Sequence, residues 1–173
     1  MARFLELRRH TANDGDRLTE EGVAAALEIG FDLGGGYRVA VSSGAQRATQ
    51  TLACFLAALG ERVQGGLVVE PRLRSEAEDR WRALAGQTDR GSIEEFLDLD
   101  SAFVEDEAAR LASGLSATFQ RLEHGEMAIA VGHSPTNEAA VYGLTGQAIA
   151  PMGKGQGVLV VSDAGGHRVE RLR

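Results

Sequence analysis

Short apolar runs and longer segments of helical periodicity alternate along the chain. Four apolar runs are short enough for buried strands: residues 4–7, 39–41, 67–69 and 127–131. Between them, apolar residues recur every three or four positions, as on one face of a helix. Two further strand candidates, residues 158–161 and 168–172, flank the turn sequence Asp163-Ala164-Gly165-Gly166 and predict a hairpin. This alternation predicts an α/β fold, a three-layer α/β/α sandwich around a mostly parallel central sheet.

Five polar residues are typical signals for the start of a helix. Thr19, followed by two glutamates, predicts an N-cap with acidic residues in the first turn. Ser43, Ser75 and Ser92 each open a capping-box sequence, with a glutamate or glutamine three positions later. Ser134 precedes a proline, a pair that suits an N-cap and the first helical position. In the helix after Thr19, the spacing predicts a buried face made by Val23, Leu27, Gly30 and Phe31.

The length and composition predict one folded domain over residues 1–173. A chain of 173 residues is too short for two full cores, and 43% apolar with 25% charged residues is typical of a folded protein. Residues 75–123 have a mainly helical pattern, which predicts a helical insertion. No segment approaches the roughly 20 apolar residues of a membrane-spanning helix, and residues 1–10 lack the apolar region of a signal sequence. We therefore expect a cytoplasmic protein with no membrane partner.

The charge distribution argues against nucleic acid as a partner. The net charge is −7, whereas nucleic-acid-binding proteins usually carry a positive excess. The whole acidic excess lies in residues 61–126, which carry −7, while the segments before and after carry −1 and +1. A solvated helical face explains this excess, and a field that repels polyanionic substrates from a cleft is the functional alternative.

The candidate chemistry lies at the ends of three predicted strands. Arg9 and His10 follow the first strand, Arg47 opens the helix after the second, and His133 follows the strand at residues 127–131. In a mostly parallel sheet these ends meet in one crevice, where ligands of such folds bind. Two guanidiniums and two imidazoles there predict an oxyanion site, because arginine matches phosphate oxygens with paired hydrogen bonds.

Four separated sequence blocks resemble the histidine phosphatases, also called the phosphoglycerate mutase-like superfamily. Residues 5–11 (LELRRHT) resemble its N-terminal Arg-His-Gly signature, and residues 16–22 (DRLTEEG) its Leu-Thr-x-x-Gly block. Residues 41–51 (VSSGAQRATQT) are similar to its Ser-Ser-x-x-x-Arg-x-x-x-Thr block, and residues 130–135 (AVGHSP) to the segment with its second histidine. The blocks keep the family's order across almost the whole chain, apart from the helical middle, which is the family's variable part.

The resemblance implies a phosphoglycerate mutase-like fold and a covalent phosphohistidine formed on His10. It further implies that Arg9, Arg47 and His133 hold the phosphoryl oxygens, with no metal or cofactor required. Elementary chemistry agrees, since an attacking imidazole must be neutral and neighbouring guanidiniums disfavour its protonated form. The expected partner is a phosphorylated small molecule or a phosphohistidine protein, and the oligomeric state is left open.

The chain departs from the family pattern at two places. Thr11 stands where the signature has glycine, so that its side chain either crowds the phosphate or donates a hydrogen bond to it; we place Thr11 and Asn13 among the candidate phosphate-binding residues. Where the mutase-like branch has its general-acid glutamate, this chain has Ser75. Glu76 is the predicted catalytic acid, with Glu78, Glu138 or no acid at all as alternatives.

Three other functions remain open at this point. A phosphoglycerate mutase-like phosphotransferase would use the same residues, and a non-catalytic phosphate or phosphoprotein binder would keep the arginines while Thr11 impairs attack. Ser134, followed by Asp163 and His167, resembles the order of a serine hydrolase triad. Gly153-Lys154-Gly155 does not fit a phosphate loop, because no serine or threonine follows the lysine.

Overall fold

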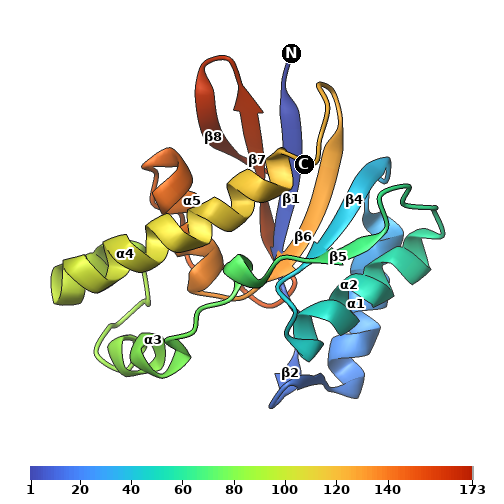
Figure 1. Ribbon diagram of the computed structural model, residues 1–173. Coiled ribbons are helices and arrows are strands. Elements are labelled where there is room, and N and C mark those ends of the chain that lie inside the picture. Colours follow the sequence, from blue (N-terminus) through green and yellow to red (C-terminus); the bar gives the residue numbers. More distant parts are fainter. Residues whose placement is uncertain (173) are drawn as a thin grey trace.

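The computed structural model describes residues 1–172; Arg173, the last residue of the expected domain, lies outside the described residues. A six-stranded sheet has the order β5-β4-β6-β1-β7-β8 (Figure 1). Its strands are β1 (Arg3–Arg9), β4 (Tyr37–Ser42), β5 (Leu67–Val69), β6 (Met127–Gly132), β7 (Gly157–Asp163) and β8 (Gly166–Arg171). The first four in spatial order are parallel, and β7 and β8 run antiparallel to their neighbours. The predicted mostly parallel sheet and terminal hairpin are confirmed.

Helices cover both faces of this sheet, which confirms the three-layer sandwich. They are α1 (Glu20–Asp32), α2 (Gln46–Leu59), α3 (Glu78–Ala85), α4 (Ile93–Phe119) and α5 (Thr136–Thr145), with a 3₁₀ turn η1 at Pro71–Leu73. One core lies between the sheet and α4 and α5, and includes Leu5 and Leu7 of β1. The other lies between the sheet and α1 and α2, and includes Ile129 and Val131 of β6 (Figure 1). Both faces of the strands are thus apolar, as buried parallel strands require.

The long helix α4 carries most of the predicted helical middle. Its backbone is non-helical at Asp100, which divides it, and Ser92 caps its start with the predicted capping box.

Among residues 1–172, no helix combines the length and the apolar composition needed to cross a membrane. The loop after β1 contains a two-strand ribbon of β2 (Asn13–Asp14) and β3 (Arg17–Leu18).

Three of the predicted serine caps are wrong, and the hydroxyl of each of these serines bonds to another side chain. Helices α2, α3 and α5 begin without a side-chain cap from Ser43, Ser75 or Ser134. The hydroxyl of Ser43 bonds to His133, that of Ser75 to Glu107, and that of Ser134 to Glu138. The prediction for Thr19 is confirmed, since its side chain accepts a hydrogen bond from the Gly22 backbone at 3.1 Å.

The predicted buried face of α1 is partly wrong. Val23 and Phe31 are exposed, at 37% and 73%, while Gly22, Ala26 and Gly30 are the buried residues of the helix. Helix α1 packs closely on α2, because a Cβ at Gly30 would lie only 2.8 Å from the Phe55 carbonyl oxygen. This close approach selects small residues for the contact and leaves the larger apolar side chains at the rim.

Candidate active site

His10 lies at the carboxyl end of β1 and is buried, with 4% of its surface exposed. Its backbone N–H donates to the Gly132 carbonyl at 3.1 Å, which ties it to the end of β6. Its Nδ1 lies 2.8 Å from the Thr11 carbonyl oxygen, so that Nδ1 carries the proton and donates. This bond fixes the tautomer in which Nε2 holds the lone pair for attack.

The surroundings of His10 keep its ring neutral. Burial lowers the pKa of His10 to about 4, and the positive charges of Lys154, Arg47 and Arg9 act in the same direction, against the bond to the Thr11 carbonyl. At neutral pH the imidazole is therefore unprotonated at Nε2. The neutrality expected from the sequence is present, and burial contributes more to it than the arginines do.

His133 follows β6 and lies beside His10 at the same end of the sheet. The two rings meet edge to face, with their centroids 5.2 Å apart. His133 Nε2 lies 2.8 Å from the Ser43 hydroxyl, which follows β4. Burial lowers the pKa of His133 to about 3, with Arg47 as the next cause. Three neighbouring strands therefore bring both histidines together, as the strand-end argument predicted.

The two arginines differ in how they are held. Arg9 is half-buried, and its Nη1 donates to the Met152 carbonyl at 2.7 Å. Arg47, in the first turn of α2, pairs with Asp16 at 2.9 Å and lies 3.7 Å from Glu78. Asp16 also accepts the backbone N–H of Arg47, so it caps α2 from the β2–β3 ribbon while it orients the guanidinium. The positive charge of Arg47 lowers the pKa of both histidines.

The candidate phosphate contacts in the loop after β1 have partners within the fold. Thr11 is buried, and its hydroxyl donates to the Gly22 carbonyl at 2.7 Å and lies 3.3 Å from the Thr51 hydroxyl. Its side chain therefore fastens the nucleophile loop to α1 and α2. Asn13 Oδ1 accepts from Lys154, and its Nδ2 donates to the Gly15 carbonyl at 2.8 Å.

The three candidate acids occupy different surroundings. Glu76 is exposed and lines an open groove outside the cavity next to His133. Glu78 is half-buried, lines that cavity, and accepts from Arg74 at 2.7 Å. Glu138 is buried behind the site, where it accepts from the Ser134 hydroxyl and the Met152 backbone N–H, both at 2.6 Å. Burial raises the pKa of Glu138.

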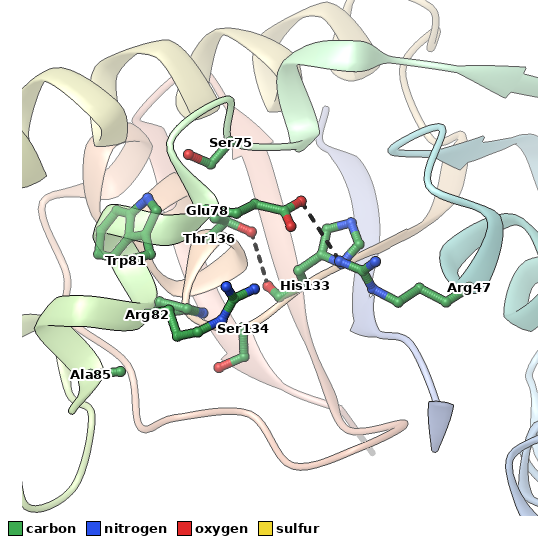
Figure 2. A pocket seen from close by; sticks show the side chains of 10 residues that line it. Arg47, Ser75, Glu78, Trp81, Arg82, Ala85, His133, Ser134 and Thr136 are labelled. Carbon is green, nitrogen blue, oxygen red and sulfur yellow. Dashed lines mark hydrogen bonds and ion pairs between the residues drawn. The ribbon is translucent and has the colours of Figure 1, made fainter. Parts of the chain in front are cut away.

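A cavity of about 270 Å³ opens beside His133 (Figure 2). Figure 2 shows Glu78 aimed at Arg47 and His133, with Trp81 and Arg82 contributed by α3. Trp81 is 2% exposed, packs on Phe96 and Phe103, and donates to Glu107 at 3.0 Å. It is therefore a packing residue that also supplies part of the cavity wall.

Sequence reasoning missed Lys154 as a neighbour of the nucleophile. The loop between α5 and β7 carries it, and the Gly155 backbone N–H donates to the His10 carbonyl at 3.3 Å. Partial burial and the guanidiniums of Arg9 and Arg47 lower the pKa of Lys154 to about 8. The signal that was available is its rarity, since it is the only lysine in the sequence.

The structure gives no support to a serine hydrolase triad. Ser134 follows the carboxyl end of β6, whereas Asp163 ends β7 next to Ser162, which pairs with Arg3 at the amino end of β1. Asp163 pairs with Arg168, and His167 lies against Phe119. Ser134 thus lies at one end of the sheet, and Asp163 and His167 lie at the other. Within residues 1–172, no group of three or more histidine, cysteine or acidic side chains is arranged to hold a metal ion.

Solved structures with the same architecture cover nearly the whole chain. A Bacillus stearothermophilus protein, YhfR, has a TM-score of 0.69 at 18% identity, over 98% of this chain and 96% of that one. Phosphoglycerate mutase from Bacillus anthracis has a TM-score of 0.65 at 19% identity, over 99% and 92% of the two chains. A mycobacterial glucosyl-3-phosphoglycerate phosphatase has a TM-score of 0.64 at 19% identity, over 99% and 98%.

No protein-family model matches the sequence, and no curated protein matches it either. The three structural likenesses nevertheless each extend over at least 98% of this chain. They confirm the fold expected from the four sequence blocks: this chain has the phosphoglycerate mutase-like fold.

Proposed function

We propose that the protein is a metal-independent phosphatase that transfers a phosphoryl group to His10 and then to water. The observation that carries this proposal is the state of His10, which is neutral, with Nδ1 donating to a backbone carbonyl and Nε2 left for attack. The neighbouring structures include phosphatases and a phosphoglycerate mutase, which supports chemistry of this class.

In the first step, His10 Nε2 attacks the phosphorus atom, an N–P bond forms and the bond from phosphorus to the leaving group breaks. In the second step, water attacks the phosphorus atom of phosphohistidine, the N–P bond breaks, and the proton that the water loses returns to the acid that protonated the leaving group. Inorganic phosphate leaves, and neutral His10 is restored. The Thr11 carbonyl accepts from Nδ1 throughout, which stabilises the positive charge that the ring carries as the phosphohistidine forms.

Arg9, Arg47 and His133 are proposed to bind the phosphoryl oxygens. Catalysis of phosphoryl transfer is largely positioning and charge stabilisation, which is the contribution that two guanidiniums beside the nucleophile make. Both guanidiniums are held before any substrate arrives, Arg9 by the Met152 carbonyl and Arg47 by Asp16. This preorganisation favours catalysis over loose phosphate binding.

We propose Glu78, rather than Glu76, as the donor of a proton to the leaving group. Glu78 lines the cavity with His133 and Arg47, whereas Glu76 faces the open groove outside it. The cavity beside His133 is then the space for the leaving group. Thr11 is left out of the proposed phosphate contacts, because its hydroxyl donates to Gly22.

Turnover of p-nitrophenyl phosphate, with and without vanadate and a chelator, tests this function. The proposal predicts turnover that vanadate inhibits, that the chelator leaves unchanged, and that is lost in His10→Ala. Unchanged turnover in His10→Ala would contradict it. Transfer of the phosphoryl group to an added alcohol or sugar phosphate in preference to water would instead support the mutase alternative.

A further inference from the structure

The only lysine of the chain lies beside the nucleophile. Lys154 belongs to the loop that leads into β7, the strand that flanks β1 on the side opposite to β6. His133, at the end of β6, and Lys154 therefore approach His10 from the two sides of β1. Among the charges that lower the pKa of His10, Lys154 ranks ahead of Arg47 and Arg9.

The loop that carries Lys154 is fixed to the end of β1 through the two residues that follow Lys154. The Gly155 backbone N–H donates to the His10 carbonyl at 3.3 Å, and the Gly155 carbonyl accepts from Arg8 Nη1 at 2.9 Å. The Arg9 backbone N–H donates to the Gln156 carbonyl at 2.8 Å. Gly155 has a φ of +74°, in the left-handed region that favours glycine, and this conformation turns the loop beside β1.

The ammonium of Lys154 has no acidic partner in the part of the chain that the structure describes. Its polar contact is the neutral Asn13 side chain. Lys154, Arg47 and Arg9 each lower the pKa of His10, and the two guanidiniums also lower that of Lys154. Of these, Arg47 alone has a carboxylate within ion-pair distance, in the described residues. A dianionic ligand would neutralise the charges of Arg9 and Lys154, which have no ion-pair partner among the described residues.

We propose that Lys154 is a further phosphate-binding residue, whose ammonium contacts an oxygen of the substrate phosphoryl group on the β7 side of the pocket. The inference rests on the proposed phosphatase function for its role in turnover. The ammonium donates to Asn13 Oδ1, and when substrate binds it exchanges this acceptor for a phosphate oxygen. The short Gly153–Gly155 segment thus supplies a cation from a loop that shares no sequence pattern with phosphate loops.

Selective amine labelling tests the contact directly, because the chain contains one lysine. The protein is treated with a limiting amine reagent in inorganic phosphate, or in sodium chloride of equal ionic strength, and labelled sites are located by peptide mass spectrometry. The labelling of the α-amino group serves as the internal reference. We expect phosphate to slow labelling of Lys154 several-fold relative to that reference. Equal labelling in phosphate and chloride would overturn the inference, whether or not the protein turns over substrate.

Steady-state kinetics supplies the second test. Lys154→Met is expected to raise both KM and the inhibition constant for inorganic phosphate about tenfold, the size of one lost charged contact. Lys154→Arg should recover most of that loss, since it restores the charge. Arg62→Met, which removes an exposed cation before the amino end of β5, is the matched control and should change neither constant. A Lys154→Met variant with unchanged constants would also overturn the inference.

The two proposals fail in different ways. Phosphate protection of Lys154 in a protein without turnover would support the contact and contradict the phosphatase function. Turnover that depends on His10, with Lys154 labelled equally in phosphate and chloride, would support the phosphatase function and contradict the contact.

Discussion

His10 and His133 meet edge to face with ring centroids 5.2 Å apart, and each ring is held by a different strand end. The Thr11 carbonyl accepts from His10, while the Ser43 hydroxyl lies 2.8 Å from Nε2 of His133. Two imidazoles at this distance would repel if both were protonated. Burial and the neighbouring cations keep both neutral, which is the state that nucleophilic attack by His10 requires.

We predict that the rings of His10 and His133 are both neutral over the physiological pH range. With pKa values of about 4 for His10 and about 3 for His133, both rings should remain neutral down to pH 5. NMR of the protein with ¹³C-labelled histidine, assigned with His10→Ala and His133→Ala, measures this. A midpoint near 6.5 for either ring would contradict the account.

The same depressed pKa values predict how stability depends on pH. Below pH 6.5 the unfolded chain binds protons at these histidines that the folded chain does not, so the free energy of unfolding falls as pH falls from 6.5 toward 4. Denaturant unfolding at pH 7 and pH 5 tests this. The decrease should be smaller in His133→Gln than in the wild type.

Variants of Glu78 and Glu76 test which of the two glutamates donates the proton to the leaving group. Glu78→Gln should slow turnover of alkyl phosphates by at least about 100-fold, because a poor leaving group needs a proton from a positioned acid. For aryl phosphates or phosphoramidates, whose leaving groups depart more readily, the loss should be small. Glu76→Gln, with an exposed side chain outside the cavity, is the matched control and should resemble the wild type. An equal loss with all substrates in Glu78→Gln would contradict its role as the acid.

Variants of Thr11 distinguish a role of its hydroxyl in stability from a role in substrate binding. Thr11→Val keeps the shape of the side chain and removes the bond to the Gly22 carbonyl, so it should lower the free energy of unfolding by about 1–2 kcal/mol. Thr11→Ser keeps the hydroxyl and should be closer to the wild type. Measurements of unfolding and of KM separate the two roles. A stable Thr11→Val variant with a raised KM would instead assign the hydroxyl to substrate binding.

Glu107 holds the wall of the cavity. Its carboxylate accepts from the Ser75 hydroxyl, from Trp81 Nε1 at 3.0 Å and from Arg110 Nε at 3.0 Å. Glu107→Ala leaves these donors without their partner and should lower the free energy of unfolding by about 2–4 kcal/mol. Glu105→Ala, at an exposed position of the same helix, is the control and should change it by less than about 0.5 kcal/mol. Similar stabilities for the two variants would contradict this role.

The sequence predicted the strands and the strand-end residues well, for a physical reason. Buried parallel strands are continuous apolar runs, and strands that alternate with helices place their carboxyl ends together. The sequence alone therefore predicts that His10, Arg47 and His133 meet in one crevice. The family resemblance added their roles, which periodicity does not contain.

The sequence did not predict contacts that depend on strand order. No local sequence pattern indicates that β7 lies beside β1. Lys154 and His10 are far apart in the sequence, and only the strand order brings them together. The serine caps fail for the same reason, because Ser43 and Ser75 bond to His133 and Glu107, which are remote in the sequence. Local patterns identify hydroxyls that can cap a helix, but tertiary partners decide which of them do.

The central claim is that His10 carries the phosphoryl group, and rapid quenching tests it most directly. The protein is mixed with a ³²P-labelled phosphomonoester, quenched in alkali within the first turnover, and assayed for label bound to protein. The account predicts acid-labile, alkali-stable label on His10 that appears and decays at rates able to support turnover, with none in His10→Ala. Turnover without any bound label, or label that persists in His10→Ala, would contradict it.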